Sequence, residues 1–156
     1  MTRAGLSLPD YSRAAWLHSL GRNASYLTKV AAMPTLETLD RFIARVEENA
    51  HAEAIEEFYT ENGYIQENQS LPRVGRDALV SRERAVMARA KKITSTCVRP
   101  VFVNGDLAVI RWIFHFEWLD GTVTDMEEMA YQHWEGQRIA GETFFYDPTQ
   151  RTPKKA

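Results

Sequence analysis

A carboxylate stands where the sequence otherwise reads as a buried strand. In the segment GYIQEN, Tyr64 and Ile65 begin an apolar strand, and Glu67 follows on the same face as Ile65. Either this strand ends in solvent, or it delivers Glu67 into a cavity. A carboxylate among aromatic side chains and away from water has its charged form disfavoured, so its pKa rises toward neutrality. A general acid or base that works near pH 7 needs such a pKa.

Further carboxyl and hydroxyl groups near the C-terminus could take part in the same chemistry. Glu142 and Tyr146 share strand parity with Phe144, so the three side chains fall on one face of a strand expected over 139–146. Glu128 lies in the strand before it. Proton abstraction next to a carbonyl also needs a donor that stabilises the developing oxyanion. A protonated Glu128 or the hydroxyl of Tyr146 could be that donor, with Glu67 as the base.

The same polar groups also have a purely structural interpretation. Glu67 can pair with Arg73 or Arg76, and Glu128 and Glu142 can pair with arginines across a sheet. Tyr146 can pack at the end of its strand. His115 and His133 read as structural residues within strands, and His51 is expected on the surface between two helices.

These residues are positioned by three predicted helices followed by a sheet. Helical periodicity begins at Thr35, a plausible N-cap, and continues through Val46; a second helix is expected to stop at Asn62-Gly63, and a third to run over 77–91. A period of two then predicts strands over 98–103, 107–118, 123–134 and 139–146. Asn104-Gly105 and Asp120-Gly121 are strong hairpin signals, and Glu135-Gly136 marks the third joint. The pattern predicts an α+β domain with helices on one face of an antiparallel sheet.

The strand expected over 107–118 carries large aromatic side chains on one face. Trp112, Phe114, Phe116 and Trp118 alternate with a mixed face of Arg111, Ile113, His115 and Glu117. The rings either fill the core beneath the helices or wall an apolar pocket. We expect the wall of such a pocket to consist of the following residues: Phe42, Trp112, Phe114, Phe116, Trp134, Glu142 and Phe144.

Composition excludes several function classes. The formal net charge is −2 and the pI about 6.1, so we expect no nucleic-acid partner and no membrane surface as a partner. Cys97 is the single cysteine, which fits a reducing, cytoplasmic location. No histidine pair has metal-ligand spacing and no glycine-rich phosphate loop is present, so no metal and no cofactor are expected. Residues 1–34 read as a partly helical or disordered arm, and 149–156 as a solvated tail.

The order of elements and three segments resemble the SnoaL-like branch of the nuclear transport factor 2-like superfamily, which includes ketosteroid isomerases and polyketide cyclases. The segments are FYTENGYIQEN followed by PRVGRDAL, FHFEWLDGT, and WEGQRIAGETFFYDP. The resemblance covers about residues 36–148 and implies a single domain over 35–148. It implies a cone-shaped, curved antiparallel sheet that wraps around the N-terminal helices, with a ligand pocket inside. Members are commonly dimers, so a homodimer is expected, in keeping with the mixed outer faces of the strands.

The resemblance assigns roles residue by residue. Glu67 falls at the position of the isomerases' catalytic base. Phe42 stands nearest to their oxyanion-binding tyrosine and cannot donate a hydrogen bond. Their protonated acid falls near Glu128, within a register that leaves Met129 and Ala130 as alternatives.

We therefore expect a pocket protein that binds a hydrophobic small molecule. Its expected activity is cofactor-independent acid–base catalysis on a carbonyl compound, as an isomerase, cyclase or dehydratase. The alternative is a non-catalytic ligand-binding or dimerisation module of the same fold, which the phenylalanine at position 42 favours.

Overall fold

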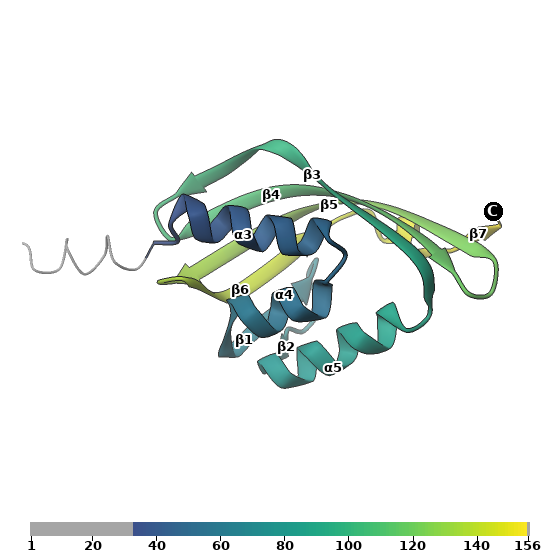
Figure 1. The fold of residues 1–156 in the computed structure, drawn as a ribbon, viewed down its shortest axis with the longest axis horizontal. Helices are drawn as coiled ribbons and strands as arrows, with labels where there is room; N and C mark the ends of the chain where they lie inside the picture. Colours follow the sequence, from purple (N-terminus) through teal and green to yellow (C-terminus); the bar gives the residue numbers. More distant parts are fainter. Residues whose placement is uncertain (1–32, 156) are drawn as a thin grey trace, which may run out of the picture.

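The helices precede the long strands in the chain and lie together on one side of the sheet (Figure 1). The computed structural model describes residues 33–155. Its helices are α3 (Leu36–Glu47), α4 (His51–Phe58), α5 (Arg76–Met87) and the short 3-10 helix η2 (Pro148–Arg151). Its strands are β1 (Tyr59–Glu67), β2 (Arg73–Val74), β3 (Ala90–Asn104), β4 (Leu107–Trp118), β5 (Thr122–Glu135), β6 (Arg138–Phe145) and β7 (Lys154–Lys155).

The sheet is mostly antiparallel, as the sequence predicts. Its strand order is β2-β1-β6-β5-β4-β3, with β7 paired to the start of β5, and only β1 and β6 run parallel. Gly105, Gly121 and Gly136 at the three hairpin joints all have positive φ, which glycine adopts without steric penalty. The predicted meander of β3 to β6 is therefore confirmed, and the fold is α+β.

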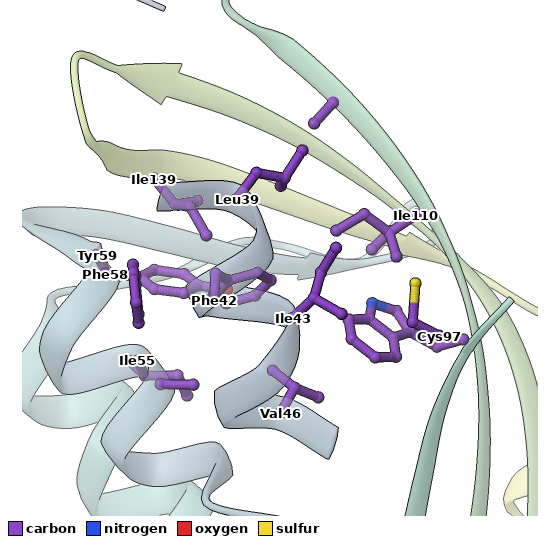
Figure 2. Packing of buried hydrophobic residues seen from close by; sticks show 14 of the residues in the cluster. Leu39, Phe42, Ile43, Val46, Ile55, Phe58, Tyr59, Cys97, Ile110 and Ile139 are labelled. Carbon is purple, nitrogen blue, oxygen red and sulfur yellow. The ribbon is translucent and has the colours of Figure 1, made fainter. Parts of the chain in front are cut away.

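Helix α3 forms where the periodicity places it. The side chain of Thr35 accepts a hydrogen bond from the backbone N–H of Thr38 at 3.1 Å, which caps the helix. Its apolar stripe lies against α4 and the inner face of the sheet, where Phe42 meets Phe58 edge to face, with ring centroids 5.6 Å apart (Figure 2). This packing makes both rings part of the hydrophobic core.

Several predicted boundaries are wrong. The second helix ends at Phe58 rather than at Asn62-Gly63, because Tyr59 is already extended and pairs with Ile139 of β6. The third helix ends at Met87, and Lys91 belongs to β3, which begins eight residues before the predicted strand. In both places strand pairing overrides a local helical pattern.

The two faces of β4 divide as predicted. Trp112, Phe114 and Phe116 are buried on the inner face, whereas Ile113 on the outer face is 42% exposed. The helices cover the concave side of the sheet (Figure 1), and Glu128, Gln132 and Glu142 on β5 and β6 are buried.

The predicted N-terminal arm and C-terminal tail have different outcomes. The expected N-terminal arm lies outside the described residues, except for Met33 and Pro34. The expected solvated tail has exposed side chains over 151–155, but its backbone is ordered: η2 is followed by β7, which pairs with Thr122 and Val123. Among the described residues, no helix is long and apolar enough to cross a membrane.

Candidate functional site

A cavity of about 750 Å³ lies between the inner face of the sheet and helices α4 and α5. Its volume falls in the range of small-molecule pockets, about 300–1,000 Å³. Aromatic rings form one wall: Phe116 stacks on Trp118 with centroids 5.0 Å apart, and Trp112 stacks on Phe114 at 5.7 Å. The predicted pocket residues that line it are Phe42, Trp112, Phe114, Phe116, Glu142 and Phe144, together with Glu67, Glu128 and Tyr146.

Trp134 does not line this cavity, which corrects its predicted position in the wall. Its side chain is 1% exposed and packs edge to face against Phe42, with centroids 6.0 Å apart. The strand parity of Trp134 is inward as expected. Because α3 covers that end of the sheet, the inward side chain meets the core instead of the open space.

Glu128 is buried on the inner face in the middle of the sheet. It pairs with Trp112 of β4, while Met129 points outward and is 38% exposed. The register thus places both Glu128 and Ala130 inward. Within residues 33–155 the Glu128 carboxyl group receives no hydrogen bond, although it lines the cavity. Burial, followed by the negative charges of Glu142 and Glu67, raises its pKa to about 8. The group is therefore mainly a neutral carboxylic acid at pH 7.

Glu142 is held in a buried hydrogen-bond network. The hydroxyl of Tyr59 donates to Oε2, and the amide of Gln132 donates to Oε1 at 2.6 Å; Gln132 in turn accepts from the indole N–H of Trp134 at 3.1 Å. Burial raises the pKa of Glu142 to about 7, although the two donors favour its ionised form. Tyr59 and Gln132 thus lie beside the carboxyl group of Glu142 when it gains or loses a proton.

Glu67 lines the cavity and is also the centre of an ion-pair cluster. Arg73 donates to its Oε1 at 2.5 Å, Tyr146 donates to its Oε2 at 2.5 Å, and Arg151 of η2 pairs with the same oxygen. Burial raises the pKa of Glu67, but these hydrogen bonds and the two positive charges outweigh it, so the net pKa is lowered. The expectation of a raised pKa at Glu67 is wrong, because two arginines share its site.

The phenol O–H of Tyr146 donates its hydrogen bond to Glu67, within that same cluster. Burial and the carboxylate of Glu67 raise the pKa of its phenol, and Arg151 donates to its oxygen at 3.1 Å. The pairing of Glu67 with Arg73, one of the two structural interpretations, is observed. It is compatible with the cavity position, because all four side chains of the cluster line the cavity.

His51 is a residue of this site that sequence reasoning missed. It was expected on the surface, but its side chain is 12% exposed and lines the cavity beside Phe114, with ring centroids 5.5 Å apart. Its Nε2 lies 2.7 Å from the hydroxyl oxygen of Ser95, and its Nδ1 lies 3.3 Å from Glu83. These partners are 44 and 32 residues away, so no local spacing could have indicated the contact.

Metal binding finds no support in the described part of the chain. Nowhere in residues 33–155 are three His, Cys, Asp or Glu side chains grouped so that they could hold a metal ion.

Comparisons with known proteins point to one family and one fold. The family model described as a SnoaL-like domain matches residues 39–142. An epoxide hydrolase of Mycobacterium tuberculosis, described as LEH-like, has a similar structure, with a TM-score of 0.62 at 9% identity over 74% of this chain and 84% of that one. A putative SnoaL-like polyketide cyclase from Jannaschia sp. CCS1 gives 0.58 at 10% identity, covering 71% of this chain and 86% of its own.

A third structure carries no assigned activity. It is a nuclear transport factor 2-like protein of unknown function from Burkholderia pseudomallei, with a TM-score of 0.63 at 9% identity, over 74% of this chain and 92% of that one. No curated protein matches this sequence. At these identities the structural similarity establishes the fold, and activities differ among proteins that share it.

Proposed function

Because the chain belongs to the SnoaL-like domain family, we propose that it binds a hydrophobic carbonyl compound and transfers protons on it without a cofactor. The observation that carries this proposal is Glu128, a buried carboxyl group with a pKa raised to about 8 that lines an aromatic cavity. A neutral acid in such a place can donate a hydrogen bond to a carbonyl oxygen. It thereby stabilises the enolate that forms when an adjacent carbon loses its proton.

The base of this reaction is assigned to Glu142 rather than to Glu67. A base works best when its pKa lies near the working pH, and the pKa of Glu142 is about 7. Glu67 has a lowered pKa and three donors on its oxygens, so it accepts a proton poorly. We assign Glu67, together with Tyr146, to holding the polar side of the cavity in place.

Binding without catalysis is the second candidate. It is favoured by the network around Glu142, since both of its carboxylate oxygens already accept hydrogen bonds from Tyr59 and Gln132. Phe42, which offers no hydroxyl group to a ligand, favours it as well.

Deuterium exchange distinguishes the two candidates without knowledge of the natural substrate. The α-protons of 2-tetralone, a bicyclic aromatic ketone, are followed by NMR in D₂O with and without the protein. Catalysis predicts exchange faster than in buffer, with a loss of about 100-fold on Glu128→Gln, because glutamine keeps an N–H donor but cannot share or transfer a proton as a carboxylic acid does. Binding of the ketone with exchange no faster than in buffer would contradict catalysis.

The control is Glu127→Gln, the neighbouring residue on the outer face, where Glu127 pairs with Arg111 at 2.7 Å. It makes the same carboxyl-to-amide replacement one position along the strand but does not face the cavity. Its exchange rate is expected to equal that of the unmodified protein. An equal loss in both variants would assign the effect to general charge or to folding.

The outer face of the sheet supports a second proposal, that the protein is a homodimer. Four apolar residues cluster there, each between 38% and 44% exposed: Ile113, Met129, Tyr131 and Phe145. Arg111 and Glu127 border them, and this pair of opposite charges is self-complementary across a two-fold axis. A second copy of the chain therefore fits this face.

A further inference from the structure

The arginines that line the cavity fall into two groups. Arg73 and Arg151 are neutralised by Glu67. Arg82 and Arg89, on the α5 side of the opening, also line the cavity and are exposed at its rim. Neither forms an ion pair with a carboxylate in residues 33–155. The neighbouring Arg84 differs, since it pairs with Glu56 at 2.8 Å and does not line the cavity.

Arg89 is held in place without using its N–H donors on another side chain. Its guanidinium group lies over the ring of Trp118, 5.3 Å from the centroid. Its backbone carbonyl accepts a hydrogen bond from Leu119 at 3.0 Å, which ties the end of α5 to the end of β4. A guanidinium group fixed in this way retains its fork of donors for a ligand at the rim.

Two acidic residues lie on the same side of the cavity, and each has its contacts with groups other than Arg82 and Arg89. Asp120 is near Arg89, but its Oδ1 accepts two hydrogen bonds from Thr122, at 2.9 and 2.7 Å. Glu83, the other acid on this side, faces His51. The rim therefore holds two arginines without direct carboxylate partners, in a protein whose formal net charge is −2.

We infer that the ligand of this cavity is an elongated amphipathic anion, with its apolar body against the aromatic wall and its negatively charged group at Arg82 and Arg89. The position of the ligand's negatively charged group follows from distances along β4. Glu128 pairs with Trp112, six residues before Trp118 on β4, which corresponds to about 20 Å of extended chain. The reactive carbonyl and the anionic group thus lie at opposite ends of the molecule. This inference rests on the proposed function for the cavity and adds a substrate class to it.

Two dyes that share an aromatic body test the inference. 8-Anilinonaphthalene-1-sulfonate carries a sulfonate, and N-phenyl-1-naphthylamine is the same body without charge. Kd is measured for each from dye fluorescence, and displacement of one dye by the other shows that they share a site. The double variant Arg82→Gln with Arg89→Gln is compared with the unmodified protein and with Arg84→Gln.

The expected result is a selective loss. The double variant should bind the sulfonate dye roughly tenfold more weakly, since two exposed charge pairs are lost, and should bind the neutral dye as before. Arg84→Gln should change neither value. An equal effect on both dyes, or a loss in Arg84→Gln as large as in the double variant, would overturn the inference while leaving the apolar cavity intact. Failure of both dyes to bind would overturn the proposed function with it.

Discussion

Replacing Glu128 by glutamine should change how the stability of the protein depends on pH. The pKa of Glu128 is about 8 in the folded protein, against the ordinary value of 4.5 that applies to the unfolded chain. Between these values the folded state binds a proton that the unfolded state does not. The free energy of unfolding therefore falls as the pH rises from about 4.5 to about 8, and stays reduced above that range.

The size of this effect follows from the same two pKa values. At about 1.4 kcal/mol for each pH unit, a difference of about 3.5 corresponds to about 5 kcal/mol. Glutamine cannot ionise, so Glu128→Gln should lack this loss. Because the free energy of unfolding of a domain is about 5–15 kcal/mol in total, the variant should become clearly more stable than the unmodified protein by pH 9.

The assay is urea denaturation at five pH values from 5 to 9, followed by tryptophan fluorescence, with Glu127→Gln as the control. Glu127 is 55% exposed on the outer face, so its variant should follow the unmodified protein. Glu142, whose pKa is about 7, adds a fall of the same sign to all three proteins. Because its charge acts on Glu128, the difference between the unmodified protein and Glu128→Gln measures the two carboxyl groups as a pair. Parallel curves for Glu128→Gln and the unmodified protein would show that Glu128 ionises as it does in water, and would refute the reasoning.

Three further predictions concern the core, the ion-pair cluster and the outer face. Ile43 is 1% exposed, so Ile43→Ala should lower the free energy of unfolding, measured by urea denaturation, by about 2–5 kcal/mol. Leu36 on the same helix is 73% exposed, so Leu36→Ala should change this free energy little. The lowered pKa of Glu67 gives a stabilisation that is present above about pH 4.5 and lost as the pH falls through the folded pKa. By urea denaturation, the unmodified protein should therefore be more stable than Glu67→Gln at neutral pH, and this difference in the free energy of unfolding should narrow below pH 4.5. A difference independent of pH would contradict the prediction. If the protein is a homodimer through its outer face, light scattering should give twice the 17.9 kDa chain mass for the unmodified protein and the mass of one chain for Met129→Glu. The control is Leu71→Glu, which alters an exposed residue of the β1–β2 loop and should leave the dimer intact. A monomeric unmodified protein would refute the dimer.

Short-range patterns in the sequence were sufficient to predict most of the fold. The stripe from Leu39 to Val46 and the Asn104-Gly105 and Asp120-Gly121 joints are short-range signals, and each appears in the structure where it was expected. The errors occur where a distant partner decides the conformation. Tyr59 leaves its helix because Ile139, 80 residues later, pairs with it in the sheet.

The location of the candidate site could be predicted from the sequence, whereas the pKa values of its carboxyl groups could not. Strand parity indicated an inward Glu142, while the register at Glu128 was left open between 128 and 130; both carboxyl groups line the cavity. The pKa of each carboxyl group depends on residues far away in the chain. The expected shift of the pKa of Glu67 is reversed by Tyr146 and Arg73, joined by Arg151, which reaches Glu67 across 84 residues. No spacing in the sequence indicates that contact.

The ionisation of Glu128 can be observed directly. In ¹³C-labelled protein, its side-chain carboxyl resonance is assigned by its absence from Glu128→Gln and then followed from pH 4 to pH 10. A neutral acid facing the cavity predicts a midpoint near 8. A midpoint near the ordinary value of 4.5 would mean that water reaches the carboxylate freely, and would contradict the proposed role of Glu128 as the proton donor of this cavity.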